Sequence, residues 1–294
     1  MKSVSISLNG VSAVIGTEGA ALIGLLVNNF DLIEPNTRDG LYAGRILAPW
    51  PNRIKDGQYS FNNIDYQLPI NEVSKNNSLH GLVANSLWEI TFQNQSKIIL
   101  EYLLNRPEIY PGKLQLQVTY EIIEHGVEIT VLSENIGEIS APYGVSIHTY
   151  LVAGALVKNS ELYLQLPADQ FLEVDTDRLL PIKLQPVAGT NFDFINPKKI
   201  SDLFIDHAFK YSSDYPRSIS LLNKDGQGAE VIFDEQSNWL QIHTADRDLQ
   251  ADSRMAVAIE PMSCPPDAFN SEMDLIVLEP GNKHEYKMTI KRKG

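Results

Sequence analysis

Alternation of apolar and polar residues runs along most of the chain and predicts β-strands from end to end. In Lys113–Ile122 every second residue is apolar, and charged or amide residues stand between them. Successive side chains of a strand point to opposite faces, so this segment would cover a core with one face and meet solvent with the other. Val127–Val131 repeats the pattern, and Gly126 between the two segments predicts the turn of an antiparallel hairpin.

Further segments have the composition of short strands, whereas amphipathic helical periodicity is nearly absent. They are Ser3–Leu8, Lys97–Leu104, Ser146–Leu151, Glu161–Leu166, Ser218–Leu222, Glu230–Phe233, Trp239–Thr244, Asp274–Leu278 and Glu285–Lys291. One short turn of helix is predicted at Lys198–Leu203, because Asn196 offers an N-cap and Pro197 suits the first helical position. Many short strands separated by turn residues predict an all-β fold, a large antiparallel β-sandwich. Because no linker-like segment interrupts the chain, we predict a single domain over residues 1–294.

The segment Gly40–Val83 differs in amino-acid composition from the predicted strands around it. Arginine, asparagine, proline and glycine are packed there between short apolar stretches. We expect it to form arches across the mouth of the sandwich, where binding groups tend to lie.

Charge and cysteine content narrow the classes of partner. The 294 residues carry a formal net charge of −13, and such a field repels nucleic acid and anionic membrane surfaces. The single cysteine excludes an internal disulfide framework and fits a reducing compartment. The N-terminus has no long apolar core of a signal peptide, and no run approaches the length of a membrane helix. A cytoplasmic protein with a small-molecule ligand is the expectation.

The first candidate functional group lies at the end of a short apolar strand, Met255–Glu260. Glu260 shares a strand face only with Ala256 and Ala258, and it precedes Pro261, where the strand is expected to stop. A carboxylate in that position has open space in front of it. Taken alone, it is also what an ordinary acidic residue at a loop rim looks like.

Four other polar residues stand at strand ends or in the arches. Arg53 lies between a Pro-Trp-Pro corner and a glycine turn, and His80 precedes a glycine that permits close approach to its ring. His148 lies on the polar face of its predicted strand, and Asp206 follows an apolar stretch. A structural role is open for each of them individually.

Other chemistries have weaker support. None of the histidines has the paired local spacing of a metal site, and no glycine-rich strand–helix turn offers a phosphate cradle. Cys264 lies in a proline loop, where packing is a more common role than nucleophilic attack. The remaining groups suit a neutral, hydroxyl-rich ligand and proton transfer with no metal and no cofactor.

Together these segments resemble the aldose 1-epimerase (galactose mutarotase) family, in a form similar to a short bacterial subgroup. The matching pieces follow the family's order from about Arg45 to the C-terminus. They are P-N-R-I-K-D-G-Q-Y-S-F, N-S-L-H-G-L, P-Y-G-V-S-I-H-T-Y-L, I-D-H-A-F, I-E-P-M-S-C-P-P-D-A-F-N and L-E-P-G. Each piece is short, and the ordered set is specific.

The resemblance implies a β-supersandwich with a monosaccharide bound in a cleft across one face. It implies that Glu260 is the catalytic base and His148 the catalytic acid, while Arg53, His80 and Asp206 hold sugar hydroxyls. The base would remove the C1 hydroxyl proton while the acid protonates the ring oxygen. After rotation of the open aldehyde, the ring closes with the roles reversed. We expect the two catalytic side chains to be separated by one sugar edge rather than in direct contact.

Two departures from the family pattern concern the choice of sugar. The chain has Glu260-Pro261-Met262 where the family often has Glu-Thr-Gln. A glutamine that helps to bind sugar in some members has no clear match near Gln236–Asn238.

Two alternative functions stay open. A hexose-6-phosphate 1-epimerase would need basic residues near the phosphate, for which Arg53, Lys55 and Arg254 are candidates. A non-catalytic carbohydrate-binding protein could use Trp239 or Phe269 as stacking platforms.

Overall fold

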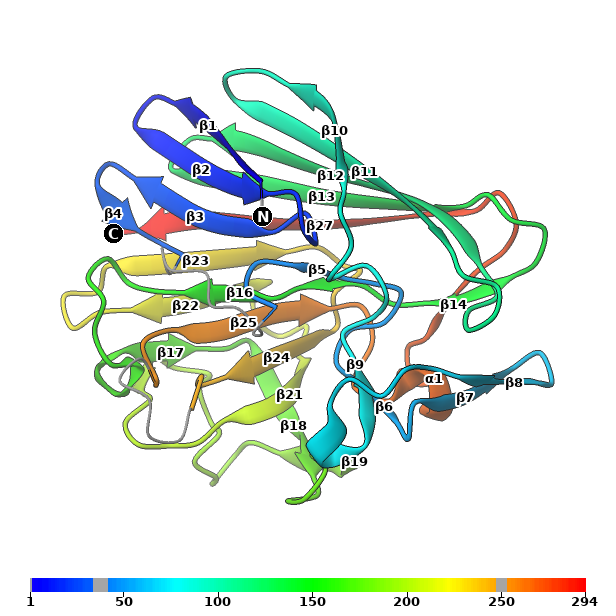
Figure 1. The fold of residues 1–294 in the computed structure, drawn as a ribbon. Helices are drawn as coiled ribbons and strands as arrows, with labels where there is room; N and C mark the ends of the chain where they lie inside the picture. Colours follow the sequence, from blue (N-terminus) through cyan, green and yellow to red (C-terminus); the bar gives the residue numbers. More distant parts are fainter. Residues whose placement is uncertain (1, 34–41, 247–252) are drawn as a thin grey trace.

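The protein is built almost entirely of antiparallel β-strands, arranged in two large sheets and several small ones (Figure 1). The computed structural model describes residues 2–33, 42–246 and 253–294. The predicted all-β fold is confirmed. Only three single helical turns occur in the described part of the chain: η1 (Val73–Lys75), η2 (Asn159–Glu161) and α1 (Ala268–Ser271).

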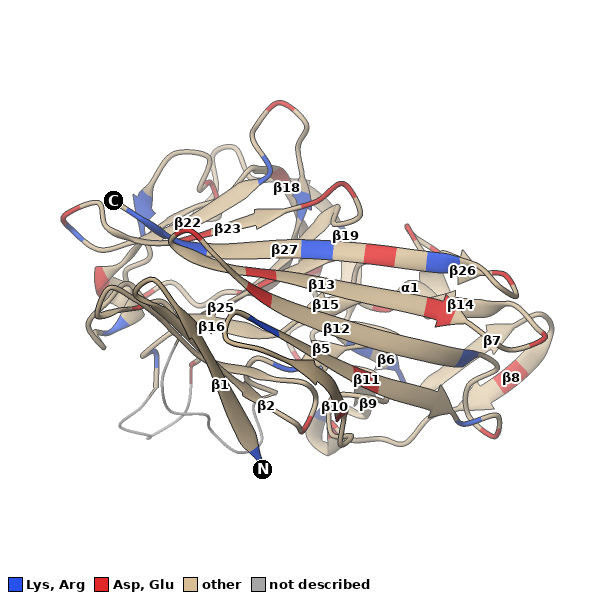
Figure 2. Ribbon diagram, turned by 90° about the horizontal axis from the view of Figure 1, so that it is seen from above, with Lys and Arg blue, Asp and Glu red and all other residues tan. Residues whose placement is uncertain are grey.

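The larger sheet has nine strands and contains the hairpin predicted from the alternating pattern. In spatial order its strands are β10 (Glu89–Gln93), β11 (Lys97–Asn105), β12 (Lys113–Ile123), β13 (Gly126–Asn135), β27 (Lys283–Lys293), β23 (Gly228–Phe233), β22 (Ser218–Leu222), β17 (Tyr163–Gln165) and β20 (Lys198–Lys199). Strict burial at every second residue of β12 shows that one face covers the core. The other face is polar, and basic and acidic residues follow one another along β27 (Figure 2).

The second sheet has eight strands. Its path is β19 (Pro181–Pro186), β18 (Ala168–Val174), β21 (Asp206–Tyr211), β24 (Trp239–His243), β25 (Val257–Met262), β15 (Ser146–Ile147) and β5 (Ile46–Leu47), and β16 (Thr149–Leu151) pairs with β25 off this path. Apolar side chains of both large sheets, among them Val118 and Ile259, belong to one buried cluster. This cluster leaves the opposite face of the eight-stranded sheet free to carry polar groups.

Smaller sheets complete the fold. A four-stranded sheet consists of β1 (Ser3–Leu8), β2 (Val11–Gly16), β3 (Leu22–Val27) and β4 (Phe30–Asp31). Three two-stranded ribbons are β6 (Arg53–Lys55) with β9 (Asn77–Leu79), β7 (Gln58–Phe61) with β8 (Ile64–Gln67), and β14 (Ala141–Tyr143) with β26 (Ile276–Leu278). No helix in the described residues is long and apolar enough to cross a membrane.

Two local predictions are wrong for identifiable reasons. Gly126 is not the hairpin turn: it pairs with Ile123 inside β13, and His125 in the left-handed region (φ 68°) supplies the turn. Glycine is required at position 126 because a Cβ there would lie 2.1 Å from the carbonyl oxygen of Ile290. The helix expected at Lys198–Leu203 is absent, because Lys198 and Lys199 pair with β17 as the edge strand β20.

Two predicted strands near the candidate residues also have different limits. The strand Ser146–Leu151 is broken at His148, whose backbone bonds to the arch: its N–H donates to Arg45 and its carbonyl accepts from Gly44. The strand containing Glu260 does not stop there but continues through Pro261 to Met262. The carbonyl of Pro261 accepts hydrogen bonds from two hydroxyls, those of Ser146 and Tyr286, which tie this part of β25 to its surroundings.

Candidate active site

Strands β24 and β25 carry alternate apolar and polar side chains, and the polar ones lie on the face turned away from the main core. Leu240, Ile242 and Ile259 enter the core cluster. Gln241 and Glu260, which face each other in the register of the two strands, line a cavity instead. The alternation of β-strands thus places the buried carboxylate of Glu260 on the cavity side of the sheet, between Ala258 and Met262 of its own strand face.

The other wall of the cavity comes from the arch segment, as expected for Gly40–Val83, of which Gly40 and Leu41 lie outside the described residues. The cavity has a volume of about 260 Å³. Its lining residues are Tyr42, Asn52, Arg53, Glu72, Lys75, Leu79, His80, His148, Tyr150, Asp206, Gln241, His243 and Glu260. The structure therefore brings Arg53, His80, His148, Asp206 and Glu260 together, although they are far apart in sequence.

Glu260 and His148 are in direct contact. Nε2 of His148 lies 3.4 Å from Oε1 of Glu260, and both side chains are almost fully buried. The expectation of a gap one sugar edge wide between the two side chains is therefore wrong. The reason is the break between β15 and β16, which carries His148 out of regular strand geometry and places its ring beside β25.

Burial favours the neutral form of both groups. It raises the pKa of Glu260 well above its usual value, and the nearby Asp206 acts in the same direction while Arg53 opposes it. Burial, assisted by His243, lowers the pKa of His148 to about 3. The two shifts together favour a pair that shares one proton, held by Glu260 rather than by His148.

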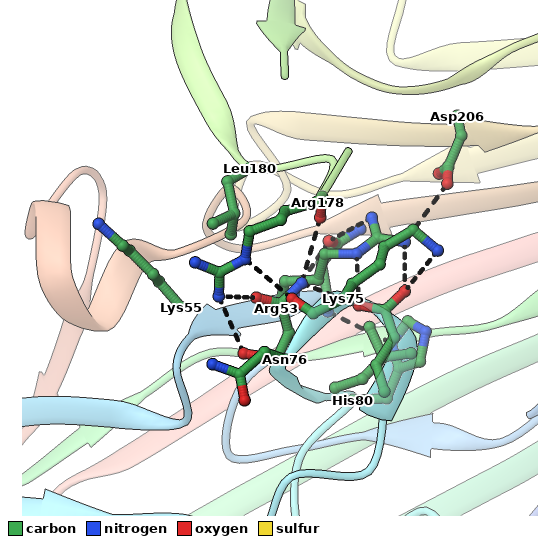
Figure 3. A network of polar contacts seen from close by, with 12 residues as sticks. Arg53, Lys55, Lys75, Asn76, His80, Arg178, Leu180 and Asp206 are labelled. Carbon is green, nitrogen blue, oxygen red and sulfur yellow. Dashed lines mark hydrogen bonds and ion pairs between the residues drawn. The ribbon is translucent and has the colours of Figure 1, made fainter. Parts of the chain in front are cut away.

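Arg53 is held between two carboxylates (Figure 3). Its Nε and Nη2 donate to the two carboxylate oxygens of Glu72 at 2.9 and 3.0 Å, and Nη2 lies 3.4 Å from Oδ2 of Asp206. Burial, the largest single effect, opposes ionisation of Asp206, but Arg53, His243 and His207 together lower the pKa of that carboxyl. Asp206 thus presents a negative charge to the cavity.

His80 lies in the left-handed region with φ 62°, next to Gly81. Gly81 allows close approach of the Ala48 backbone rather than of the imidazole, because a Cβ would lie 2.1 Å from the Ala48 carbonyl oxygen. Nδ1 of His80 accepts a bond from the backbone N–H of Asn52 at 3.3 Å. Burial lowers the pKa of His80, so the neutral ring carries its proton on Nε2 and can donate it to a ligand.

Gln241 and His243 are among the cavity residues that sequence reasoning did not single out. Gln241 donates from Nε2 to Oδ1 of Asp206 at 2.7 Å, and its own Oε1 has no protein partner. His243 is two residues further along the same strand face, and its buried Nδ1 likewise has no protein partner. The signal was the pattern W-L-Q-I-H-T, in which polar residues alternate with core residues. Gln241 lies near the segment where no sugar-binding glutamine had been matched.

Several alternatives lose their structural basis. Trp239 is fully buried, with its indole N–H bonded to Asp274, and Phe269 is packed against Trp50 and Tyr59, so neither can stack on a sugar.

The basic residues proposed for a phosphate do not converge. Lys55 and Arg254 are absent from the cavity wall, and Arg254 is bonded to Asp246 and to the carbonyls of Ser201 and Leu203.

Cys264 is buried, and burial raises the pKa of its thiol to about 12. Within the described part of the chain, no group of three or more His, Cys, Asp or Glu residues is arranged to hold a metal ion.

Comparison with solved structures defines the class of fold. The structure superposes on the GalM/aldose epimerase homologue of Caenorhabditis elegans with a TM-score of 0.87, over 99% of both chains and at 19% sequence identity. The fold is therefore that of the galactose mutarotase-like proteins.

Sequence comparison then identifies the family. The family model for aldose 1-epimerase matches residues 2–291. The chain is 37% identical over 293 residues to the Escherichia coli (strain K12) protein YihR, covering 98% of this chain and 92% of that one. It is 29% identical over 196 residues to human galactose mutarotase, covering 63% and 56% of the two chains. The chain belongs to the aldose 1-epimerase family, whose members are isomerases.

Proposed function

We propose that this protein interconverts the α and β anomers of a free aldose, with Glu260 and His148 as the acid–base pair. The observation that carries the proposal is the contact of 3.4 Å between Nε2 of His148 and Oε1 of Glu260 in a cavity lined by hydroxyl-binding groups. One carboxylate and one imidazole that share a single proton form an acid and a base, which is the requirement for opening and closing a hemiacetal.

The sequence of proton transfers follows from where that proton lies. The proton of Glu260 passes to Nε2 of His148 when a sugar hydroxyl donates to the carboxylate, because such a bond stabilises the ionised form. Glu260 then takes the proton of the C1 hydroxyl, and His148 gives its proton to the ring oxygen as the C1–O5 bond breaks. Rotation about C1–C2 and the reverse transfers close the ring on the other face. Atoms and protons balance without any other reactant.

Polarimetry tests the activity directly. Freshly dissolved α-glucose, α-galactose and related aldoses should reach anomeric equilibrium faster with the purified protein than without it. A non-catalytic carbohydrate-binding protein would bind one of these sugars and leave the rate at its spontaneous value. That result, obtained over a full panel of aldoses, would refute the proposed function.

Asp206→Ala is expected to raise KM and to lower kcat/KM by about 10- to 100-fold. Asp206 offers a charged acceptor to sugar hydroxyls, and losing a hydrogen bond to a charged group costs about 1.5–3 kcal/mol. Initial rates over a range of sugar concentrations measure the effect. Asp202→Ala, in an exposed residue four positions earlier, is the control and should behave like the wild type. Equal kinetics for the two variants would remove Asp206 from the binding site.

The pH profile is expected to be flat on its acid side. The working state of the pair holds one proton, and the distribution of that proton between the two groups does not depend on pH. A second proton enters only near the lowered pKa of His148, at about 3. We therefore expect kcat/KM at pH 5 to lie within about twofold of its value at pH 7, where a histidine of ordinary pKa would give a marked fall. An acid limb with its midpoint near 6.5 would contradict this.

A hexose 6-phosphate is a second candidate substrate because of Lys75. This residue lines the cavity, and its Nζ lies 3.4 Å from a carboxylate of Glu72 that Arg53 already engages. It therefore places a second cation, besides Arg53, on the cavity wall. Comparison of kcat/KM for glucose and glucose 6-phosphate, in wild type and in Lys75→Gln, decides the matter. Preference for the phosphate that disappears in the variant would favour this candidate.

A further inference from the structure

Arg178 does not line the cavity, but its guanidinium donates hydrogen bonds to the arch segment that forms one wall (Figure 3). It comes from the turn between β18 and β19. Its Nε donates to the carbonyl of Lys75 at 2.8 Å, and its Nη2 donates to the carbonyl of Asn76 at 2.9 Å. The same Nη2 lies 3.1 Å from Oδ1 of Asn77.

These contacts meet a need of the arch. The helical turn η1 is only three residues long, has no side-chain cap at Glu72, and ends at Asn76 in the left-handed region. The last carbonyls of a helical turn have no partner within it and must be satisfied from outside. Arg178 supplies that partner, and so it fixes the end of this turn, next to the strand β9 that is held by its pairing with β6.

The turn that presents Arg178 is itself well defined. Oδ1 of Asp175 accepts from the backbone N–H groups of Asp177 and Arg178, and its Oδ2 accepts from that of Leu180. A carboxylate that bonds several backbone donors of its own turn restricts the conformations of that turn. The backbone of this turn therefore holds the guanidinium of Arg178 in a defined position next to the arch.

A continuous series of hydrogen bonds connects the contacts of Arg178 with the arch to the cavity. Asn77, which is fully buried, donates from Nδ2 to Oε2 of Glu72 at 3.0 Å and to the carbonyl of Arg178 at 3.1 Å. Glu72 in turn holds the guanidinium of Arg53 through two bonds. Arg53 then reaches Asp206. Each member of the series has its orientation set by the previous one.

We propose that Arg178 is a positioning residue of the active site: it fixes the arch and, through Asn77 and Glu72, sets Arg53 against Asp206. The inference rests on the proposed function for its kinetic consequence. Arg178 touches no reacting atom, so its effect should fall on sugar binding rather than on proton transfer. Displacement of binding groups by a fraction of an ångström is enough to weaken a hydrogen-bonded ligand.

Arg178→Met is expected to raise KM for the best aldose substrate roughly tenfold and to leave kcat within about twofold of the wild type. Arg217→Met is the matched control. Arg217 also donates to two backbone carbonyls, those of Asp234 and Ser237, and to a side-chain amide, but it does not line the cavity. A purely structural role would lower the melting temperature of both variants and leave KM unchanged in both. That outcome overturns the proposal.

A double-mutant cycle checks the route of the effect. If Arg178 acts through Glu72, then Arg178→Met should raise KM by less than twofold once Glu72→Gln is present, because coupled residues are not additive. Full additivity of the two changes would show that Arg178 does not act through Glu72 and would overturn the proposal.

Amide hydrogen exchange separates this proposal from the proposed function. Arg178→Met should increase exchange of the amides in residues 73–80, including that of His80, whereas Arg217→Met should not. If the wild type accelerates mutarotation of none of the sugars, the proposed function fails. The exchange data still test whether Arg178 holds the arch in place. Unchanged exchange in Arg178→Met would overturn the proposal whatever the activity.

Discussion

Glu260→Gln is expected to lower kcat for mutarotation by roughly 10²–10⁴-fold while changing KM little. Glutamine has the shape of the carboxyl group and can still bond a sugar hydroxyl, but it can neither take nor give a proton. Because Glu260 is buried beside Ala258 and contacts His148, no other carboxylate in the cavity occupies its position relative to the imidazole. The measurement is the initial rate of anomer interconversion, after subtraction of the spontaneous rate.

The cavity offers a matched control for this change. Glu72→Gln is the same substitution in another carboxylate of the same wall, but Glu72 is engaged by Arg53 and lies outside the pair. We expect it to raise KM through displacement of Arg53, with a much smaller effect on kcat. If Glu260→Gln keeps near wild-type turnover, or if both variants lose kcat equally, Glu260 is not the base.

His148→Asn is expected to lower kcat by a similar factor, roughly 10²–10⁴-fold, from the other side of the pair. Asparagine has no ionisable group near Oε1 of Glu260. No side chain in that position can then take the proton from Glu260 and pass it to the ring oxygen. Once one member of the pair is lost, removal of the second should cost little more, since residues that act as a unit are far from additive. The double variant Glu260→Gln/His148→Asn tests that expectation.

His80→Asn is the matched control for the histidine. His80 lies in the left-handed region, which asparagine tolerates better than most residues, so the backbone should be preserved. His80 faces the same cavity, and its ring centroid lies 5.0 Å from that of His148. We expect this variant to raise KM and to keep most of kcat. Equal loss of kcat in the two histidine variants would mean that the acid is not specifically His148.

The strand pattern of this chain could be predicted from sequence because it depends on local alternation. Lys113–Ile122, which has strict period two, forms a strand within one residue of its predicted limits, and the shorter Ser218–Leu222 forms a strand with the predicted limits. The same alternation placed Glu260 on the face of Ala258, away from the core. Two of the wrong predictions, Gly126 and Lys198–Leu203, fall where close contact with another strand or pairing at a sheet edge overrides the local signal.

What surrounds the candidate residues was decided by tertiary structure alone. The contact of His148 with Glu260 joins residues more than a hundred positions apart, and it depends on a strand break that the arch backbone imposes through Arg45. The lowered pKa of His148 and the raised pKa of Glu260 follow from burial, which no local pattern reveals.

The same reason explains the groups that sequence reasoning did not find. Gln241 becomes a site residue only because the register of β24 sets it opposite Glu260 and beside Asp206. Arg178 becomes connected to Arg53 only because two loops about a hundred residues apart are packed together through Asn77. The sequence determined which side chains are available and which face of a strand they occupy. Their distances, partners and protonation were set by the packing of one sheet face against an arch, since these depend on residues that are remote along the chain.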